Sequence, residues 1–446
     1  MAPRLLHYSD IENAYDRPER IGRLVGTIAA HRDDETIVVG TGDDTAPGAL
    51  ALERRGRQAV PFFERVGPDA ETFGNHDFDY GVGAAADIAV DAPVEYVSAN
   101  LRIDGDPVAG VDPATVVERA GERVALVGVA DPALSLPPSV SVTDPVAAVR
   151  ETTDGLAADW VVVLAHTRAA VARDLARETP ADAVLAGHVH SVARERVDDT
   201  LVVRPGANGR VVWDVRLDEP VTATRRPVPS GPLDEPMAET VRAQLTEAGL
   251  AEVVATVGEA VERDRDAALR GESRLANLAT DALRWVADVD VAHVDTRGLR
   301  DGPPLGPEVT VADLVGLAPF EAGVFVATVS GRQVRSLVAE SYRSEGADGR
   351  DGEVWTGQFS GLTLRRDRSR GETRVFVRDG GRRRPLDPDG DYRLATNGYV
   401  VYTDEFETVG PADARELHGL QYEAFVAYGR ETGLDPEIDD RVESVD

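Results

Sequence analysis

The chain contains no cysteine and no lysine. The lack of cysteine excludes disulfide bonds, thiolate nucleophiles and cysteine-ligated metals. The lack of lysine means that all 48 basic residues are arginines, and the 79 acidic residues bring the formal charge to −31. Such an acidic excess repels nucleic acids and anionic membranes, so we expect neither as a partner.

Long apolar runs are also missing. No uncharged stretch approaches the roughly 18 residues that cross a bilayer, and the N-terminal residues lack the basic and apolar regions of a signal peptide. We therefore expect a cytoplasmic protein without a membrane partner. Hydrophobic residues still form 42% of the chain, which is enough to build folded cores. This acidic, lysine-free composition is typical of halophilic proteins, whose carboxylates stay solvated in concentrated salt.

The first half of the chain has the pattern of a layered α/β domain. Short apolar segments rich in Val, Leu and Ile alternate with segments of helical spacing, such as 21–32 and 145–156. The predicted strands are residues 5–9, 36–41, 123–129, 160–165, 183–186 and 201–203.

A proline-rich stretch then interrupts the pattern, and its prolines cannot continue a strand or helix. We place a linker at 221–236, between a first domain at 1–220 and a second at 237–446. The second domain has an α+β pattern, and its arginine-rich stretch 365–384 is interpreted as a solvated hairpin. Its predicted helices are 237–263, 275–286, 333–342 and 417–430, and its predicted strands are 289–294, 323–329, 373–377 and 392–396.

Polar residues that could bind metal follow the ends of the predicted strands in the first half, where α/β sheets build their sites. Two divalent ions about 3.5–4 Å apart need about seven oxygen and nitrogen ligands, one of them a bridging carboxylate. A lone histidine or an Asp-x-Glu pair is often structural, but here the whole set falls in one domain. The candidate ligands are Asp10, Glu12, Asp43, Asn75, His166, His188 and His190.

The segment from Gly74 to Gly81 is the most informative stretch of the chain. It places an amide, an imidazole and two carboxylates between glycines, in the order Gly-Asn-His-Asp-Phe-Asp-Tyr-Gly. Such a turn can direct Asn75 to a metal while His76 faces a substrate. Asp43 is the natural bridging ligand, because Gly42 before it permits a close backbone approach.

The order of these motifs resembles the calcineurin-like metallophosphoesterases, and residues 74–81 are similar to the 5'-nucleotidase/UDP-sugar hydrolase family, here of a haloarchaeal type. The resemblance implies an N-terminal four-layer αββα domain and a C-terminal α+β substrate domain. It also implies a dinuclear phosphohydrolase acting on nucleoside 5'-monophosphates or a related small phosphoester. By the same resemblance, His76 stabilises the transition state and Asp79 orients it. The implied ligands are Asp10, Glu12, Asp43 and His190 for the first metal, and Asp43, Asn75, His166 and His188 for the second.

The chain departs from the family at residue 12, where the family normally has histidine. Glu12 can still bind a metal, but its carboxylate makes the ligand set richer in oxygen. We therefore expect Mn²⁺, Mg²⁺ or Co²⁺ to serve better than Zn²⁺.

The second half keeps only part of the substrate pocket that the resemblance implies. Arg300 matches an arginine that binds phosphate, and Arg297 is either a second phosphate ligand or the partner of a neighbouring acid. Ala322 stands where the family has an asparagine. Candidates for base and ribose contacts are Phe320, Tyr399 and Asp404.

Two alternatives to the monoesterase stay open from the sequence. One is a phosphodiesterase or pyrophosphohydrolase acting on cyclic nucleotides or nucleotide sugars. The other is a phosphoester-binding protein without catalytic activity. The base and the oligomeric state also stay open.

We predict that the protein loses structure in dilute buffer and is stabilised by molar KCl. The reason is that the Debye length falls to about 3 Å near 1 M salt, which screens the repulsion among the acidic side chains. Thermal melts at low and molar KCl test this, and an equal melting temperature in both would contradict it.

Overall fold

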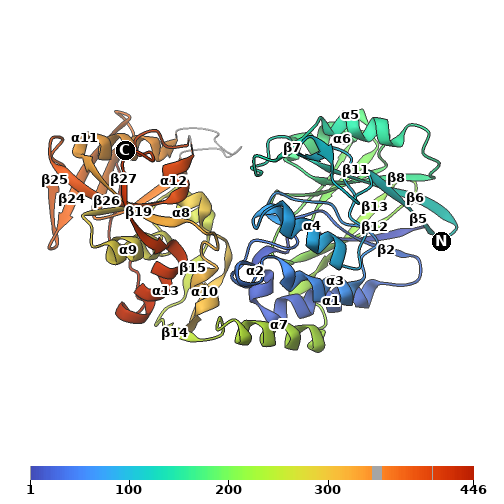
Figure 1. Ribbon diagram of the computed structural model, residues 1–446, viewed down its shortest axis with the longest axis horizontal. Coiled ribbons are helices and arrows are strands. Elements are labelled where there is room, and N and C mark those ends of the chain that lie inside the picture. Colours follow the sequence, from blue (N-terminus) through green and yellow to red (C-terminus); the bar gives the residue numbers. More distant parts are fainter. Residues whose placement is uncertain (1, 344–353, 404, 446) are drawn as a thin grey trace. The chain divides into compact units, whose positions relative to one another are not determined.

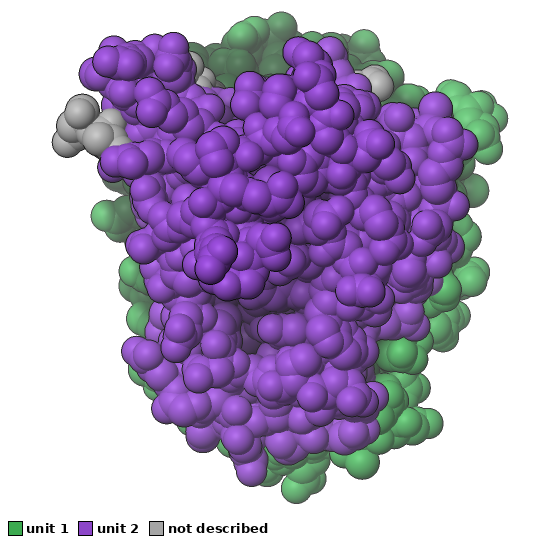
Figure 2. Space-filling view, turned by 90° about the vertical axis from the view of Figure 1, so that its left-hand side faces the viewer, with its two compact units in different colours: residues 1–249 green, residues 250–446 purple. Residues whose placement is uncertain are grey.

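The computed structural model describes residues 2–343, 354–403 and 405–445. It contains two compact units, one ending at Gly249 and the other beginning at Leu250, which Figure 2 shows in different colours. No helix among the described residues is both long and apolar enough to cross a bilayer.

Between residues 2 and 249, the first unit contains thirteen strands and seven α-helices, with short 3-10 helices between them. The strands are β1 (Arg4–Tyr8), β2 (Thr36–Gly40), β3 (Leu101–Ile103), β4 (Asp106–Pro107), β5 (Ala114–Arg119), β6 (Glu122–Ala130), β7 (Val140–Val142), β8 (Trp160–His166), β9 (Ala183–Gly187), β10 (Ala193–Val197), β11 (Thr200–Arg204), β12 (Val211–Arg216) and β13 (Thr222–Pro227). The α-helices are α1 (Pro18–His31), α2 (Ala49–Arg54), α3 (Val60–Val66), α4 (Val82–Asp91), α5 (Pro145–Thr153), α6 (Ala169–Glu178) and α7 (Glu235–Glu247). The 3-10 helices are η1 (Glu12–Asp16), η2 (Arg57–Ala59), η3 (His76–Phe78) and η4 (Val228–Ser230).

Two large sheets form the centre of this unit, in the strand orders β13-β12-β1-β2 and β10-β11-β9-β8-β6-β5. A single core cluster joins side chains of both sheets, such as Leu5 and Val39 from one and Leu126 and Val162 from the other. The sheets therefore pack face to face. Helices α5 and α6 cover the outer face of the larger sheet, and α1 and α3 lie on the opposite side of the unit (Figure 1). The predicted four-layer αββα architecture is confirmed.

Strand direction brings the candidate ligands to common edges. β1 and β2 are parallel neighbours, and β6, β8 and β9 are parallel to one another in the second sheet. β8 and β9 are almost continuously apolar, as expected for strands that are covered on both faces. Candidate metal ligands lie at or directly after the ends of these strands, so the strands determine where those side chains are placed.

The second unit contains fifteen strands and six α-helices among its described residues. The strands are β14 (Val253–Thr256), β15 (Val261–Arg263), β16 (Val291–Asp295), β17 (Gly302–Leu305), β18 (Glu308–Thr310), β19 (Gly323–Ser330), β20 (Tyr342–Arg343), β21 (Val354–Trp355), β22 (Gly357–Ser360), β23 (Leu362–Asp367), β24 (Glu372–Asp379), β25 (Arg382–Pro385), β26 (Asp391–Asn397), β27 (Ala414–Leu420) and β28 (Val442–Val445). The helices are α8 (Arg265–Arg270), α9 (Arg274–Ala287), α10 (Val311–Val315), α11 (Gly331–Glu340), α12 (Gly398–Tyr402) and α13 (Gln421–Thr432), with the 3-10 helix η5 (Thr296–Gly298).

This unit is an α+β domain, as predicted. Its sheets have the orders β22-β16-β26-β19-β27 and β25-β24-β23-β28, with three two-stranded sheets beside them. One core cluster joins both larger sheets and α11, through residues such as Val291, Leu337, Leu364 and Val377. Helix α9 begins where Ser273 caps it by accepting a hydrogen bond from the Ala276 N–H, and it packs against β16, β22 and α13.

The structure differs from the predicted boundary between the domains. Residues 222–227 of the expected linker form β13, which pairs antiparallel with β12. Val221 and Ala223 enter the core cluster of the first unit, so burial outweighs the prolines around them. Helix α7 also packs on α1, and Arg65 forms an ion pair with Asp234 at 2.7 Å. The first unit therefore extends to Gly249.

Two predicted helices are partly wrong. The helix expected at 237–263 ends at Glu247, because Gly249 follows with a φ of +71°. Residues 253–256, three of which are β-branched, then form β14. The helix expected at 417–430 begins only at Gln421, because residues 414–420 pair with β19 as β27.

Candidate metal centre

The candidate ligands of the first unit converge, as the strand ends require. Asp10 and Glu12 follow β1, Asp43 follows β2, His166 is the last residue of β8, and His188 follows β9. We define two clusters by their members: the first is Asp10, Glu12 and His190, and the second is Asp43, His166 and His188.

Within each cluster the possible ligand atoms all lie within 4.8 Å of one another. Glu12, Asp43 and His76 form a third such group, which links the two clusters. Glu12 Oε1 lies 3.0 Å from His190 Nε2, and Asp43 Oδ2 lies 3.1 Å from His166 Nε2. A carboxylate therefore stands between the clusters, as a bridging ligand must.

The residues present fit divalent cations. Asp10, Glu12 and Asp43 are each 1% exposed, and three buried carboxylates so close together need positive charge to compensate them. Asn75 adds a neutral oxygen: its Oδ1 is buried and accepts no hydrogen bond from the residues that the structure describes. Carboxylate, amide and imidazole donors are ligands that Mn²⁺, Mg²⁺, Co²⁺ and Zn²⁺ accept to different degrees.

The backbone around the ligands is strained. Four of them have positive φ angles, at 49° for Asp10, 48° for Glu12, 55° for Asp43 and 70° for His188. A non-glycine residue in this region costs of order 1–3 kcal/mol, and such residues cluster at functional sites. Close packing of the loops adds to this constraint, because a Cβ at Gly42 would lie 2.3 Å from the Gly74 nitrogen. The close approach expected at Gly42 is therefore present.

Hydrogen bonds hold the imidazole of His166 and the backbone of His188 in place before any cation binds. His166 Nδ1 donates to the Thr41 carbonyl at 2.7 Å, which leaves Nε2 directed toward Asp43. The backbone N–H of His188 donates to both carboxylate oxygens of Asp10 at 3.1 Å. Ser9 Oγ donates to Asp10 Oδ2 at 2.5 Å. The carboxylate of Asp10 therefore accepts hydrogen bonds from residues after β1 and after β9, in addition to being a candidate ligand of the first cluster.

Burial and charge shift the titration of these groups in opposite directions. Burial raises the pKa of Asp10 to about 7, against the influence of His166. Burial also acts to raise the pKa of Asp43, but the charges of His166 and His76 outweigh it and lower that pKa to about 2. Burial lowers the pKa of His188 to about 4, with the charge of His166 adding to the effect. Asp43 is therefore charged and His188 neutral near pH 7, the forms in which both residues bind metals.

His76 has the partner expected from the sequence. Its Nδ1 lies 2.9 Å from Asp79 Oδ2 and 3.1 Å from Oδ1, and its N–H donates to Asp43 Oδ1 at 2.7 Å. The carboxylate of Asp79 accepts from Nδ1–H and leaves Nε2 at the other end of the ring. The second contact fixes the backbone of His76 to the second cluster.

Asp77 is a residue whose role sequence reasoning missed. Its side chain is buried and accepts hydrogen bonds from the N–H groups of Asp43 at 2.9 Å, Gly74 at 2.8 Å and Thr45 at 3.2 Å. The Thr45 hydroxyl donates a fourth bond at 2.7 Å. This carboxylate ties the loop after β2 to the turn that carries Asn75. The position of Asp77 within the motif 74–81 could have pointed to a structural role. Only the fold shows which N–H groups donate hydrogen bonds to it.

The substrate candidates of the second unit lie near η5 and the start of α12. Arg297 pairs with Asp295 at 2.9 Å and with Glu405 at 2.9 Å, which raises its pKa despite burial. The second of the two sequence interpretations, a partner of neighbouring acids, is therefore the one observed. Its guanidinium also lies 5.9 Å from the centre of the Tyr399 ring, and Tyr399 is 44% exposed.

Arg300 is buried, with its guanidinium 6.0 Å from the centre of the Phe320 ring. An arginine therefore stands beside an aromatic ring at both of these candidate positions. Asp404 lies outside the described residues.

Comparisons with known proteins match both halves of the chain. Residues 3–192 match the calcineurin-like phosphoesterase family, and residues 252–409 match the 5'-nucleotidase C-terminal domain. Among curated proteins, the trifunctional nucleotide phosphoesterase protein YfkN of Bacillus subtilis is 22% identical over 99% of this chain and 35% of its own length. The chain spans about a third of the length of the curated relatives it matches.

Solved structures match the fold over the whole chain. The 5'-nucleotidase precursor of Thermus thermophilus has a TM-score of 0.83 and 23% identity, with 100% of this chain and 99% of that chain covered. The sulfate thiohydrolase SoxB of the same species has a TM-score of 0.77 and 20% identity, covering 100% and 97% of the two chains. At these identities the likeness establishes the fold.

We predict that Asp77→Asn destabilises the first unit by about 1–3 kcal/mol, because the amide cannot accept all four bonds and leaves buried N–H groups unpaired. Urea denaturation in molar KCl measures the change in unfolding free energy. Asp87→Asn, on the exposed face of α4, is the matched control and should leave it unchanged. Equal stabilities of Asp77→Asn and the control variant would contradict the role assigned to Asp77.

Proposed function

Because the chain belongs to the 5'-nucleotidase family, with a calcineurin-like phosphoesterase domain before a 5'-nucleotidase C-terminal domain, we propose that it is a dinuclear metal-dependent phosphohydrolase. Its proposed substrates are nucleoside 5'-monophosphates or a related small phosphoester. The proposal rests chiefly on one observation: two compact clusters of carboxylates and imidazoles share a border at Glu12 and Asp43.

The proposed ligands divide between two cations as the clusters do. Asp10, Glu12, Asp43 and His190 would hold one cation. Asp43, Asn75, His166 and His188 would hold the other. When bound, two such ions supply Lewis-acid polarisation of the phosphoryl group and lower the pKa of the attacking water.

The protein's own contribution is orientation and charge. His76 faces the border between the clusters and, with Asp79 behind it, can donate a hydrogen bond to the negative charge that develops on the phosphoryl oxygens. The Thr41 carbonyl accepts from Nδ1–H of His166, so Nε2 is the nitrogen that would bind a cation, and it would release its proton to do so. These contacts need no rearrangement at the moment of reaction, which is where such preorganised groups gain their effect.

Substrate binding is assigned to the second unit, to Arg300, Phe320 and Tyr399, with Asp404 kept as a proposed ribose contact. Arg297 is already neutralised by two acids, so its proposed part is to position Tyr399 rather than to hold phosphate. Ala322 and Gly398 offer no polar side chain for reading the edge of a base, so we infer weak discrimination among bases.

A diesterase or pyrophosphohydrolase activity is the second candidate. It is favoured by the same lack of base-reading side chains, and by the name of a relative, a trifunctional nucleotide phosphoesterase, that matches 99% of this chain. A phosphoester-binding protein without turnover is the third. It is motivated by Glu12, which stands where the family normally has histidine, and by the altered substrate pocket.

We predict that wild-type protein with Mn²⁺ in molar KCl hydrolyses AMP faster than 2',3'-cyclic AMP or UDP-glucose. His76→Ala should lower kcat/KM on the preferred substrate by about a hundredfold or more, because it removes a preorganised donor to the transition state. His31→Ala, at the end of α1, is the control and should keep full activity. Faster turnover of either diester would replace the monoesterase, and no turnover with bound metal would replace the enzyme by a binding protein.

We also predict that Mn²⁺, Mg²⁺ or Co²⁺ restores activity to metal-stripped protein better than Zn²⁺, because Glu12 makes the first cluster richer in oxygen. Glu12→His should shift the preference toward Zn²⁺, since imidazole suits that ion. Initial rates after adding each ion to both proteins measure this. Restoration of the wild type by Zn²⁺ alone would contradict the role given to Glu12.

A further inference from the structure

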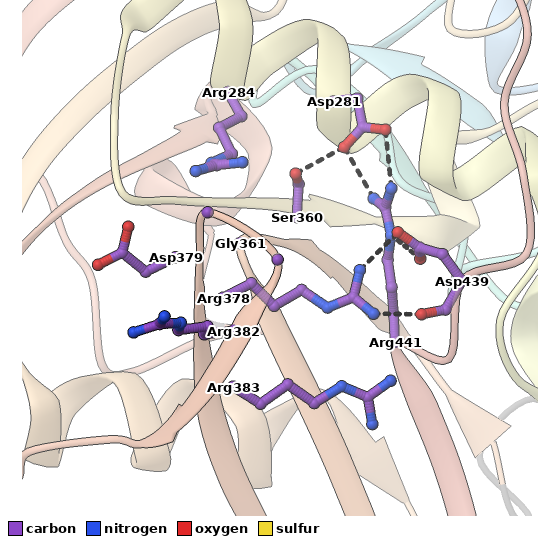
Figure 3. Close-up of a pocket in the computed structure, with 12 residues that line it drawn as sticks. Asp281, Arg284, Ser360, Gly361, Arg378, Asp379, Arg382, Arg383, Asp439 and Arg441 are labelled. Atoms are coloured by element: carbon purple, nitrogen blue, oxygen red, sulfur yellow. Dashed lines mark hydrogen bonds and ion pairs between the residues drawn. The ribbon is translucent and has the colours of Figure 1, made fainter.

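The second unit contains a cavity of about 330 Å³ that none of the proposed substrate residues lines. Four segments distant in sequence build it: α9, the turn between β22 and β23, the hairpin of β24 and β25, and residues 439–441 before β28 (Figure 3). Among its lining residues are five arginines and three aspartates, which leaves a formal excess of two positive charges. This excess is notable in a chain whose formal charge is −31.

Ion pairs within the cavity wall neutralise three of the five arginines. Arg441 makes two parallel contacts of 2.8 Å with the oxygens of Asp281 and a third of 2.8 Å with Asp439. Arg378 pairs with Asp439 as well and donates to Thr363 at 2.8 Å. Arg383 pairs with acids on and before β28. These three arginines form a neutralised wall.

Arg284 and Arg382 are different. No ion pair of the described residues includes either side chain, and Figure 3 shows both without a contact to the other residues drawn. The Nε of Arg284 donates to the main-chain carbonyls of Val289 at 3.2 Å and Asp290 at 3.1 Å. These bonds hold the guanidinium in place while its two terminal nitrogens stay available to a ligand. Arg382 is the first residue of β25, in the hairpin that β25 forms with β24.

Asp379 adds an acceptor beside this pair of arginines. It is the strand partner of Arg382 across the two-glycine turn of the hairpin, and no ion pair of the described residues includes it. A guanidinium presents a planar fork that matches a phosphate bidentately. A carboxylate next to it repels a bare anion but accepts a hydrogen bond from a hydroxyl.

From these contacts we infer that the cavity is a second ligand site, separate from the proposed metal centre, which binds a small phosphomonoester carrying hydroxyl groups. Arg284 and Arg382 bind the phosphate, and Asp379 accepts from a hydroxyl. The volume is at the lower end of the range for small-molecule pockets, which begins at about 300 Å³. The stretch 365–384 lies in antiparallel hairpins whose last turn is exposed to solvent, and that turn also lines the cavity.

The test is the binding of ribose 5-phosphate to the full chain in molar KCl with EDTA, measured by calorimetry. EDTA prevents hydrolysis of the probe at the candidate metal centre. The wild type should bind the probe, and Arg284→Ala and Arg382→Ala should each weaken binding by about tenfold or more, as expected for the loss of a charge-assisted contact. Arg374→Ala is the matched control, because Arg374 is an exposed arginine of β24 outside the cavity, and it should bind as the wild type does.

Two further measurements keep the proposal falsifiable if an arginine variant fails to fold. Asp379→Ala should keep binding inorganic phosphate while losing affinity for ribose 5-phosphate, because it removes the acceptor for the hydroxyl. Phenylglyoxal modification of the wild type, followed by peptide mapping, should show that ribose 5-phosphate protects Arg284 and Arg382 but not Arg374. A wild type that binds no probe, or variants and protection patterns that match the control, would overturn the proposal.

Discussion

The electrostatic repulsion among three buried carboxylates, Asp10, Glu12 and Asp43, is the constraint on which the candidate site of the first unit depends. Charges so close together in a dry interior cost several kcal/mol unless cations or imidazoles compensate them. Each carboxylate follows the end of a strand, and the strands hold the three side chains close together despite their repulsion. The same rigidity that makes the arrangement unfavourable without cations prepares it to bind them.

The loops that carry these carboxylates are held from behind by a second set of polar contacts. Asp77 ties the Asp43 loop to the Asn75 turn, and the Thr41 carbonyl fixes His166. The backbone at several ligands has a positive φ, a conformation that survives only where neighbouring contacts enforce it. Strain in the loops and hydrogen bonds behind them are therefore parts of one arrangement, and removing the supporting contact should release the strained loop.

The structure brings together residues that the sequence offered as candidate ligands, and only part of this convergence follows from local sequence. Asp10 and Asp43 follow β1 and β2, parallel neighbours that end at one edge of a sheet, so the sequence pattern accounts for their meeting. His166 ends β8 of the other sheet, and it reaches them only because the two sheets pack face to face. The domain boundary was harder. Prolines near residue 220 predicted a linker, but β13 gains more from pairing with β12 and burying Val221 than the prolines cost. Such tertiary contacts cannot be predicted from the composition of a short sequence segment.

Arginine is the residue whose role the sequence predicts least, because its partners lie far along the chain. Arg297 pairs with Glu405 and Arg441 with Asp281, at separations of more than a hundred residues, and both are neutralised. Arg284 instead uses main-chain carbonyls only a few residues away, which fix it without cancelling its charge. In a chain so rich in acids, an arginine held by carbonyls keeps its charge for a ligand, and one held by carboxylates does not. The distinction between an anion site and a structural ion pair therefore lies in the partner, and local sequence composition does not reveal it.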